Sequence, residues 1–305
     1  MESILSFCFA VLIAPLLPAV IQKVKAYIAG RQGPPLLINY YTMFKLFKKG
    51  SVYSTSTSFV FKMGPVVGFS TSLMILLYFP MAEIAPIFSF HGDVLILFYL
   101  MGLGRFFTIL AALDTASPFE GMGAAREAFF STLAEMTIFG ILILFYRLTG
   151  SLSFHEFFSG DHMINLIGEY GALLLLVVVG LYIVMLTENS RVPVDDPATH
   201  LELTMIHEVM ILDHSGPDLA LIELGSWFKL LFYAGFLARI IDPFHAENVI
   251  VNGLIFYGVV TFIYITIGIV ESITARYKMP MVPKFILTPF ILIFFVTILT
   301  MGVLQ

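Results

Sequence analysis

The sequence of 305 residues contains little charge and a single cysteine. Charged residues make up 12% of it, whereas a soluble chain usually carries about 25%, so an ordinary soluble enzyme is excluded. An iron–sulfur cluster typically needs about four thiolates. With Cys8 alone, the chain can hold no such cluster by itself and no internal disulfide.

Histidine is missing from the long apolar runs of the sequence. The histidines lie between these runs, at His91, His155, His162, His200, His207, His214 and His245. A membrane cytochrome would place histidine ligands inside its spans, so the pattern argues against bound haem. If the protein takes part in electron transfer, we expect another subunit to carry the electrons.

Apolar residues are abundant and make up 59% of the chain. A helix that crosses a membrane needs about 20 mostly apolar residues. Eight runs meet this need: residues 3–22, 64–83, 94–113, 128–147, 170–187, 219–240, 249–270 and 285–304. We therefore predict an all-α, polytopic integral membrane protein, with residues 1–305 as a single membrane domain. The first run lacks a basic start and a small-residue cleavage site, so we expect a retained helix rather than a secretory signal.

Lysine and arginine predict the orientation of the spans in the cell membrane. One set of connections holds Lys23, Lys25, Arg31, Lys45, Lys48, Lys49, Lys62, Arg126, Arg191, Arg276, Lys278 and Lys284, and the other set holds only Arg147 and Arg239. The positive-inside rule places the first set in the cytoplasm and both termini outside. The two longest connections, 23–63 and 188–218, are then cytoplasmic.

The connection 23–63 contains basic residues but no acidic ones. Apolar residues recur in it at a spacing of three and four, at Leu36, Leu37, Tyr40, Tyr41, Phe44 and Phe47. Lys45 lies within this stretch, Lys48 and Lys49 follow it, and Gly50 closes it. This pattern predicts an amphipathic helix at the cytoplasmic interface. Contact with lipid headgroups and docking of a partner both remain open for it.

The connection 188–218 is acidic, which is unusual on the cytoplasmic side. Its acidic residues and histidines are Glu188, Asp195, Asp196, His200, Glu202, His207, Glu208, Asp213, His214 and Asp218. A metal site is disfavoured, since no HExxH pattern occurs and His200 and His207 lie seven apart. Two readings stay open: a solvated acidic face, or a cavity in which carboxylates and histidines exchange protons.

Four charged residues interrupt the apolar runs, and they favour the second reading. They are Arg105, Glu135, Glu223 and Lys229. A charge in the middle of a membrane helix costs on the order of 2.5–3.5 kcal/mol, so such residues are functional-site hypotheses by default. Glu223 and Lys229 are six residues apart and do not face each other on one helix. We expect Lys229 to pair with a carboxylate of another helix, and Glu135 is the candidate.

The order of several motifs resembles one family. These motifs are Gly30-Arg31-Gln32-Gly33-Pro34-Pro35, Arg126 with Glu135, the Arg-x-Pro-x-Asp core of 191–195, and Asp213-His214-Ser215-Gly216. The chain resembles the membrane-anchor family that includes subunit 1 of respiratory complex I and the equivalent subunit of energy-converting, membrane-bound nickel–iron hydrogenases. The run from Asp195 to Glu208 is more similar to the hydrogenase branch. Phe130, Ala198, His200 and Gly225-Ser226-Trp227 depart from the quinone-reducing branch.

The resemblance implies a subunit without cofactors of its own. It would anchor a peripheral arm that carries iron–sulfur clusters and a nickel–iron centre, and would couple ferredoxin-driven electron transfer to proton or sodium translocation. The implied partners are the hydrogenase large and small subunits, iron–sulfur subunits, antiporter-like membrane subunits, ferredoxin and the lipid bilayer, with no nucleic acid. We expect no catalysis from this chain alone.

We assign two sets of candidate residues on this basis. The predicted proton path comprises Glu188, Asp195, Glu202, Glu208, Asp213 and His207 at its mouth, Arg126 and Arg191 beside them, and Arg105, Glu135, Glu223 and Lys229 within the bilayer. The predicted docking surface comprises Arg31, Lys45, Lys48, Asp196 and His200. Alternatives are a sulfur- or quinone-reducing complex, a stand-alone secondary transporter, and a purely structural anchor.

Overall fold

The computed structural model describes residues 2–158, 164, 166, 171–196, 205–242 and 248–303. These residues form helices and connections, without a strand among them. The helices are α1 (Glu2–Ile13), α2 (Leu17–Ile28), α3 (Ile38–Phe47), α4 (Phe59–Tyr78), α5 (Asp93–Asp114), α6 (Pro118–Thr149), α7 (Phe154–Phe157), α8 (Gly171–Glu188), α9 (His207–Met210), α10 (Pro217–Ile241), α11 (Val249–Ile273) and α12 (Val282–Val303), the last preceded by the 3-10 turn η1 (Met279–Met281).

Eight helical segments are long and apolar enough to cross a membrane, which confirms the predicted fold class. The first of them is broken between α1 and α2, where Pro15 and Pro18 interrupt the backbone hydrogen bonds. α6 begins about ten residues before the predicted span, because Pro118 suits a first helical turn and the small residues Gly123 and Ala124 after it pack against α9. Apolar runs therefore located the spans but underestimated the length of this helix.

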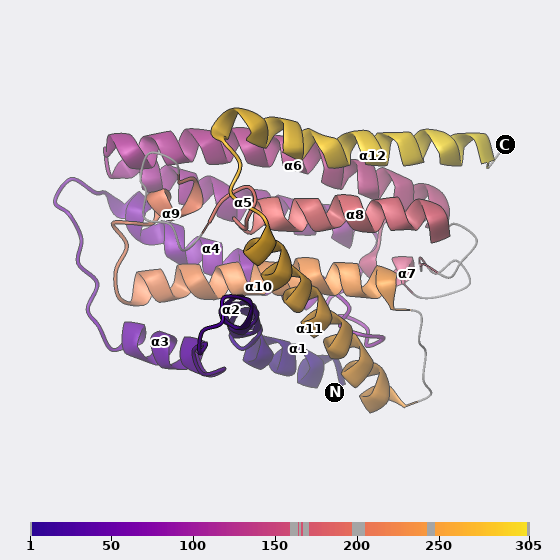
Figure 1. Ribbon diagram of the computed structural model, residues 1–305, viewed down its shortest axis with the longest axis horizontal. Coiled ribbons are helices and arrows are strands. Elements are labelled where there is room, and N and C mark those ends of the chain that lie inside the picture. Colours follow the sequence, from indigo (N-terminus) through magenta and orange to yellow (C-terminus); the bar gives the residue numbers. More distant parts are fainter. Residues whose placement is uncertain are drawn as a thin grey trace.

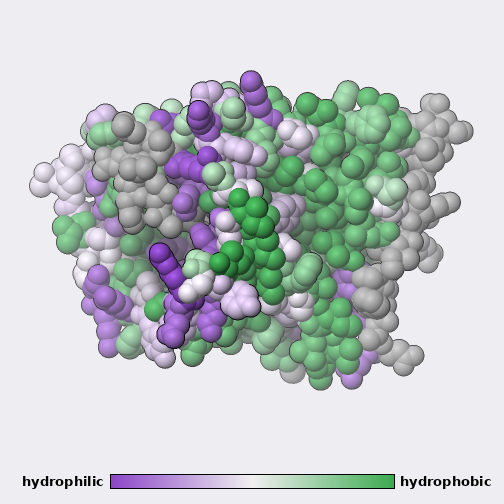
Figure 2. All heavy atoms as spheres, in the orientation of Figure 1, coloured by the Kyte–Doolittle hydropathy of each residue, from purple (hydrophilic) through white to green (hydrophobic). Residues whose placement is uncertain are grey.

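The helices lie in a bundle with two distinct ends (Figure 1). α3 and α9 lie at one end of its long axis, and α7 lies at the other, while α11 crosses the bundle obliquely. α12 packs along both α6 and α8. Hydrophilic side chains gather over the end that carries α3 and α9, which we call the polar end, whereas the other half of this face is mainly hydrophobic (Figure 2).

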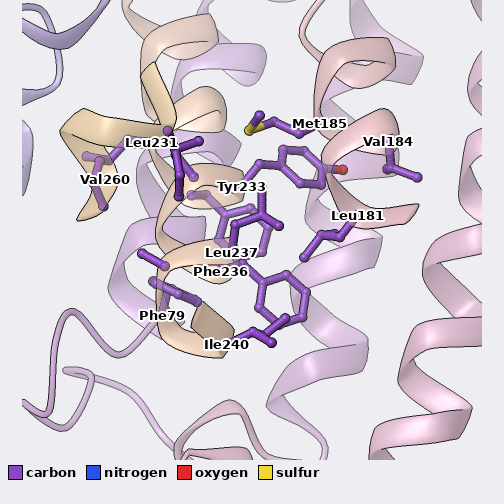
Figure 3. Close-up of a cluster of buried hydrophobic side chains, with 14 of the residues drawn as sticks. Phe79, Leu181, Val184, Met185, Leu231, Tyr233, Phe236, Leu237, Ile240 and Val260 are labelled. Carbon is purple, nitrogen blue, oxygen red and sulfur yellow. The ribbon is translucent and has the colours of Figure 1, made fainter. Parts of the chain in front are cut away.

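The core of the bundle is centred on α10. Nearly every residue from Trp227 to Ile240 is buried. Aromatic rings from other elements pack edge to face around it, with Phe79 5.2 Å from Phe232 and Phe154 5.4 Å from Phe236 between ring centroids. Figure 3 shows this cluster with apolar side chains of α8 and α10 closing around it. The middle of the molecule beyond Tyr233 is thus a dry, tightly packed layer.

The amphipathic helix predicted after Pro35 is present as α3. Its buried residues Met43 and Leu46 pack against Ala220 and Trp227 of α10, and Asn39 donates a hydrogen bond of 2.8 Å to the carbonyl of Pro15. α3 is therefore fixed to the bundle by one face. Its lysines are exposed on the other side.

Candidate functional site

A cluster of five charged side chains, from four helices, lies between α5, α6, α8 and α10. Arg105 of α5 donates hydrogen bonds to Glu135 of α6 and to Glu188 at the end of α8. Its Nε lies 3.9 Å from Glu127. Lys229 of α10 lies 2.9 Å from the same oxygen of Glu188 and donates to the Glu188 carbonyl at 2.6 Å. We call these five residues the central cluster.

Close packing of small residues brings these helices together. A Cβ atom on Gly104, next to Arg105, would lie 2.5 Å from Thr71 Oγ1 of α4. A Cβ atom on Gly225 of α10 would lie 3.4 Å from the backbone of Phe69. Small residues allow membrane helices to approach this closely. The approach carries Arg105 and Lys229 to the same carboxylate.

The pairing within the cluster corrects one prediction. Lys229 pairs with Glu188, and Glu135 pairs with Arg105 instead. The reason is that α8 continues to Glu188, so a residue assigned to a connection from the sequence lies at the depth of Lys229. The side chain of Glu188 is only 1% exposed.

Charge is not balanced within the central cluster. Among the described residues, three carboxylates face two cations. A buried site with uncompensated charge is costly, and carboxylates that share a site favour protonation of one of them. Glu135 is the most exposed of the three carboxylates, with 38% of its side chain exposed, and it pairs with Arg105.

Two hollows meet at Arg105. The first, of about 110 Å³, lies between α4, α5, α10 and the segment after α8, and polar residues line part of it. They include Thr71, Ser72, Glu127, Asn189, His207 and Ser226. Such a volume has room for several water molecules. The second is a groove of about 400 Å³ between α5 and α6, with apolar and aromatic walls and with Glu135 and Arg105 in its lining.

A third, much smaller cavity connects the acidic connection with the central cluster. It measures about 10 Å³ and is lined by Glu127, Glu188 and Asp195, among others. This is close to the space that one water molecule needs. One oxygen of Glu188 is buried without a hydrogen-bond partner among the described residues, as expected beside a water site.

Asp195 organises the acidic connection around it. One carboxylate oxygen accepts hydrogen bonds of 3.1 Å from the backbone N–H groups of Ile206 and His207, at the start of α9. The other oxygen lies 2.8 Å from Arg276. The side chain of Asp195 is 1% exposed, so this predicted path residue is firmly paired.

The remaining predicted path residues lie in varied places. His207 lines the 110 Å³ hollow, Glu223 lies partly buried near Glu208, and Asp213 is exposed. Glu202 lies outside the described residues. The two arginines expected beside them differ from each other. Arg126 donates to the Met205 carbonyl at 3.0 Å, and Arg191 lies 3.4 Å from Glu271.

The predicted docking residues are on the polar end. Arg31, Lys45 and Lys48 are exposed, with the Lys48 ammonium 4.1 Å above the ring of Phe44. Asp196 is partly buried. His200 lies outside the described residues. Lys45 and Lys48 form no ion pair with the described residues.

Sequence reasoning missed three charged residues of the site. Glu127 belongs to the central cluster, Glu271 pairs with Lys25 and Arg191, and Glu120 is buried with both carboxylate oxygens unpaired among the described residues. Glu127 and Glu271 each lie one residue outside a predicted apolar run, whereas Glu120 lies in the connection between two runs. For Glu127 and Glu271, closeness to the end of a span was the available signal.

His214 occupies a buried position at the polar end. Its ring stacks on Phe61 with 4.0 Å between centroids. Burial lowers the pKa of His214 to about 4, against weaker opposing effects of Asp218 and Asp213. The imidazole is therefore neutral at neutral pH, which favours a packing role over proton exchange.

These features define a class of protein: a multi-span membrane subunit with a charge cluster where a partly polar hollow meets a groove with apolar walls. Within the described residues, no group of three or more His, Cys, Asp or Glu side chains could hold a metal ion. A family profile described as NADH dehydrogenase matches residues 1–302. The chain belongs to this NADH dehydrogenase family, as subunit 1.

Relatives in sequence and structure agree with this assignment. Hydrogenase-4 component C of Escherichia coli is 29% identical over 87% of this chain and 84% of its own length. Formate hydrogenlyase subunit 4 of Escherichia coli is 25% identical over 89% of each chain. NADH-ubiquinone oxidoreductase chain 1 of Arabidopsis thaliana is 27% identical over 70% of this chain and 66% of its own length. The predicted resemblance is confirmed.

A solved structure shows the same fold. It is a chain of the membrane-bound sulfane sulfur reductase, an archaeal respiratory membrane complex, with a TM-score of 0.84 over 97% of both chains at 19% identity. This likeness supports the arrangement of the eight spans.

Proposed function

We propose that this chain is the membrane subunit of a complex I-like hydrogenase or sulfur reductase, and that its central cluster passes protons between the peripheral arm and neighbouring membrane subunits. The relatives that are components of hydrogenase complexes support the class of complex. The iron–sulfur clusters, the nickel–iron centre and the ferredoxin contact would belong to partner subunits. The polar end would face the cytoplasm, with both termini outside.

One observation carries this proposal: the central cluster lies between a hollow lined partly by polar residues and a groove with apolar walls. Glu127 and Glu188 line the hollow, which has room for several water molecules. Arg105 links these carboxylates to Glu135 in the groove between α5 and α6. A charge moved on Glu188 therefore changes the proton affinity of Glu135 through the shared guanidinium.

The dry core determines the direction of transfer. Beyond Tyr233 toward the far end of α10, the buried residues are mainly apolar and aromatic, including Phe236, Leu237 and Ile240 (Figure 3), and the buried Arg239 donates to the carbonyl of Phe158. A proton cannot cross such a layer without polar groups or water. Transfer would instead leave the chain sideways at Glu135, toward an adjacent subunit. This favours a coupling subunit over a stand-alone transporter.

The test is the substitution Glu135→Gln in the intact complex purified from membranes and placed in liposomes. We expect assembly and electron transfer from reduced ferredoxin to persist, while ion transport per electron falls by about tenfold or more, since the amide cannot accept a proton. The matched control is Glu2→Gln, an exposed carboxylate far from the cluster. Unchanged transport in the Glu135 variant would end this proposal.

A second candidate function is reduction of a lipid-soluble carrier such as a quinone. The groove of about 400 Å³, with apolar walls and two polar groups, has the size and lining typical of a small-molecule site. A carrier that copurifies with the complex, and turnover that depends on adding it back, would favour this function.

A further inference from the structure

A second set of charged residues, at the polar end, fastens the acidic connection to the bundle. Glu271, near the end of α11, has a side chain that is 1% exposed and lies between two cations. Lys25 of α2 approaches it to 2.9 Å, and Arg191 approaches it to 3.4 Å. One buried carboxylate therefore joins α2, α11 and the segment after α8.

The segment after α8 forms a second ion pair with α11 and the residues that follow it. In this pair the segment provides the carboxylate rather than the cation. Arg276, just after α11, lies 2.8 Å from Asp195, and the backbone N–H of Tyr277 donates to the carbonyl of Pro193 at 2.9 Å. The segment thus contains one cation, Arg191, and one anion, Asp195, and each lies beside a residue of opposite charge. Any shift in register would bring like charges together, so this pairing fixes one position of residues 189–196. We call Lys25, Arg191, Asp195, Glu271 and Arg276 the loop clamp.

The loop clamp lies between two functional parts of the chain. On one side, α2 packs closely on α11, where a Cβ atom on Gly268 would lie 2.9 Å from Val24. α2 leads directly to the basic connection that carries α3. On the other side, the clamped segment begins one residue after Glu188 of the central cluster, and its Asp195 holds the start of α9. The carboxylate of Glu271 joins the two sides, because it contacts Lys25 of α2 and Arg191 of the clamped segment.

We infer that Glu271 is a positioning residue that transmits movement of α2 and α3 to Glu188 and Asp195. This rests on the proposed function in one respect: binding or redox change in a peripheral arm would provide the movement. The transmission itself depends only on the contacts of Glu271. A displacement of Lys25 would leave Glu271 paired with Arg191 alone among the described cations. Without its tie to α2, the carboxylate could move together with Arg191 and shift the segment that begins after Glu188 relative to Arg105.

The first experiment measures the mechanical link without reference to ion transport. Hydrogen–deuterium exchange of the backbone is followed over residues 185–196 in the intact complex. Lys25→Met, which does not touch this segment, should raise its exchange at least about threefold, within the range expected for residues that couple two sites. Lys23→Met is the matched control, because Lys23 lies on the same helix, is exposed and forms no ion pair with the described residues. Unchanged exchange in the Lys25 variant would overturn the inference.

The second experiment separates positioning from simple loss of stability. Glu271→Gln should lower ion transport per electron about threefold or more at equal amounts of assembled complex, while electron transfer is largely retained. Glu271→Asp keeps the charge and should recover part of the ratio. A proportional loss of transport and electron transfer would show a structural role only and would contradict the inference. If Glu135→Gln has no effect while Lys25→Met still raises exchange, the proposed function fails and the link stands.

Discussion

The central cluster and the loop clamp are built from the same residue types in opposite proportion. Among the described residues, three carboxylates face two cations in the central cluster, whereas two carboxylates face three cations in the loop clamp. The central cluster borders a hollow of about 110 Å³ and a groove of about 400 Å³. Of the clamp residues, Asp195 borders only the cavity of about 10 Å³.

This difference matches the two proposed roles. The central cluster would exchange a proton, whereas the loop clamp would fix the position of residues 189–196. A surplus of carboxylates beside water favours a shared, exchangeable proton. The loop clamp has a surplus of cations instead, and the side chains of both of its carboxylates are 1% exposed. The predictions below test whether the two regions differ in this way, in order of decreasing effect.

The largest effect is expected for Arg105→Met. This substitution leaves Glu127, Glu135 and Glu188 with only Lys229, and removal of one partner from a buried ion pair costs about 3–5 kcal/mol. We expect a large loss of assembled complex, measured by its yield and thermal unfolding. Arg105→Lys is the control, because it keeps the charge but loses the forked hydrogen bonds, so stability should recover only in part. Normal stability of the Met variant would contradict the pairing described for the cluster.

Acid provides a way to perturb the polar end without substituting either charge set. Burial lowers the pKa of His214 to about 4, whereas an unfolded chain titrates its histidine near 6.5. Between these values the unfolded state binds more protons, so His214 favours folding fully above about pH 6.5 and this contribution is lost as the pH falls toward 4. We expect a loss of about 1–3 kcal/mol over this window.

Thermal unfolding of the complex between pH 7 and pH 4.5 measures this effect. His214→Gln should flatten the dependence, because it removes the titrating ring. If the slope is the same in both proteins, other groups are responsible. The contribution of His214 to the pH dependence of stability must be subtracted before any pH dependence of ion transport is assigned to the central cluster.

An effect of similar size is expected from one of two glycines on α5, which form a matched pair. Gly104→Ala would place a Cβ atom 2.5 Å from Thr71 Oγ1, whereas Gly102→Ala would meet no atom within 4 Å. The first should destabilise by about 1–3 kcal/mol and move Arg105 away from α4. The second should be neutral or stabilise slightly, since alanine is the better helix former by up to about 1 kcal/mol. Equal melting temperatures for the two variants would contradict the close packing that positions the central cluster.

The sequence predicts much of the fold and part of the site. The eight spans, the helix α3 and the importance of Arg105, Glu135 and Lys229 all follow from apolar length and from the cost of charge in a membrane. The partner of Lys229 could not be predicted in this way. The position of a residue along a helix gives its depth in the membrane, but not the rotation of that helix about its axis. Rotation is decided by helix contacts such as Gly104 against Thr71.

Residues at the ends of spans were the hardest to predict. Glu127 lies in a polar stretch that α6 nevertheless includes, so an apolar window passes over it. Glu271 pairs with Lys25, 246 residues away in sequence, and nothing local marks that contact. Both cases show that the site depends on contacts between the ends of helices. The spacing of apolar residues in the sequence does not predict such contacts.

The central claim is that one carboxyl group of the central cluster holds an exchangeable proton, and infrared difference spectroscopy of the intact complex tests it most directly. Redox cycling in H₂O and D₂O should reveal the carbonyl stretch of a protonated carboxyl group that shifts in D₂O. The account predicts that this band disappears in Glu135→Gln and persists in the Glu2→Gln control. A band that is absent from the unaltered complex, or that survives in Glu135→Gln, would contradict the account.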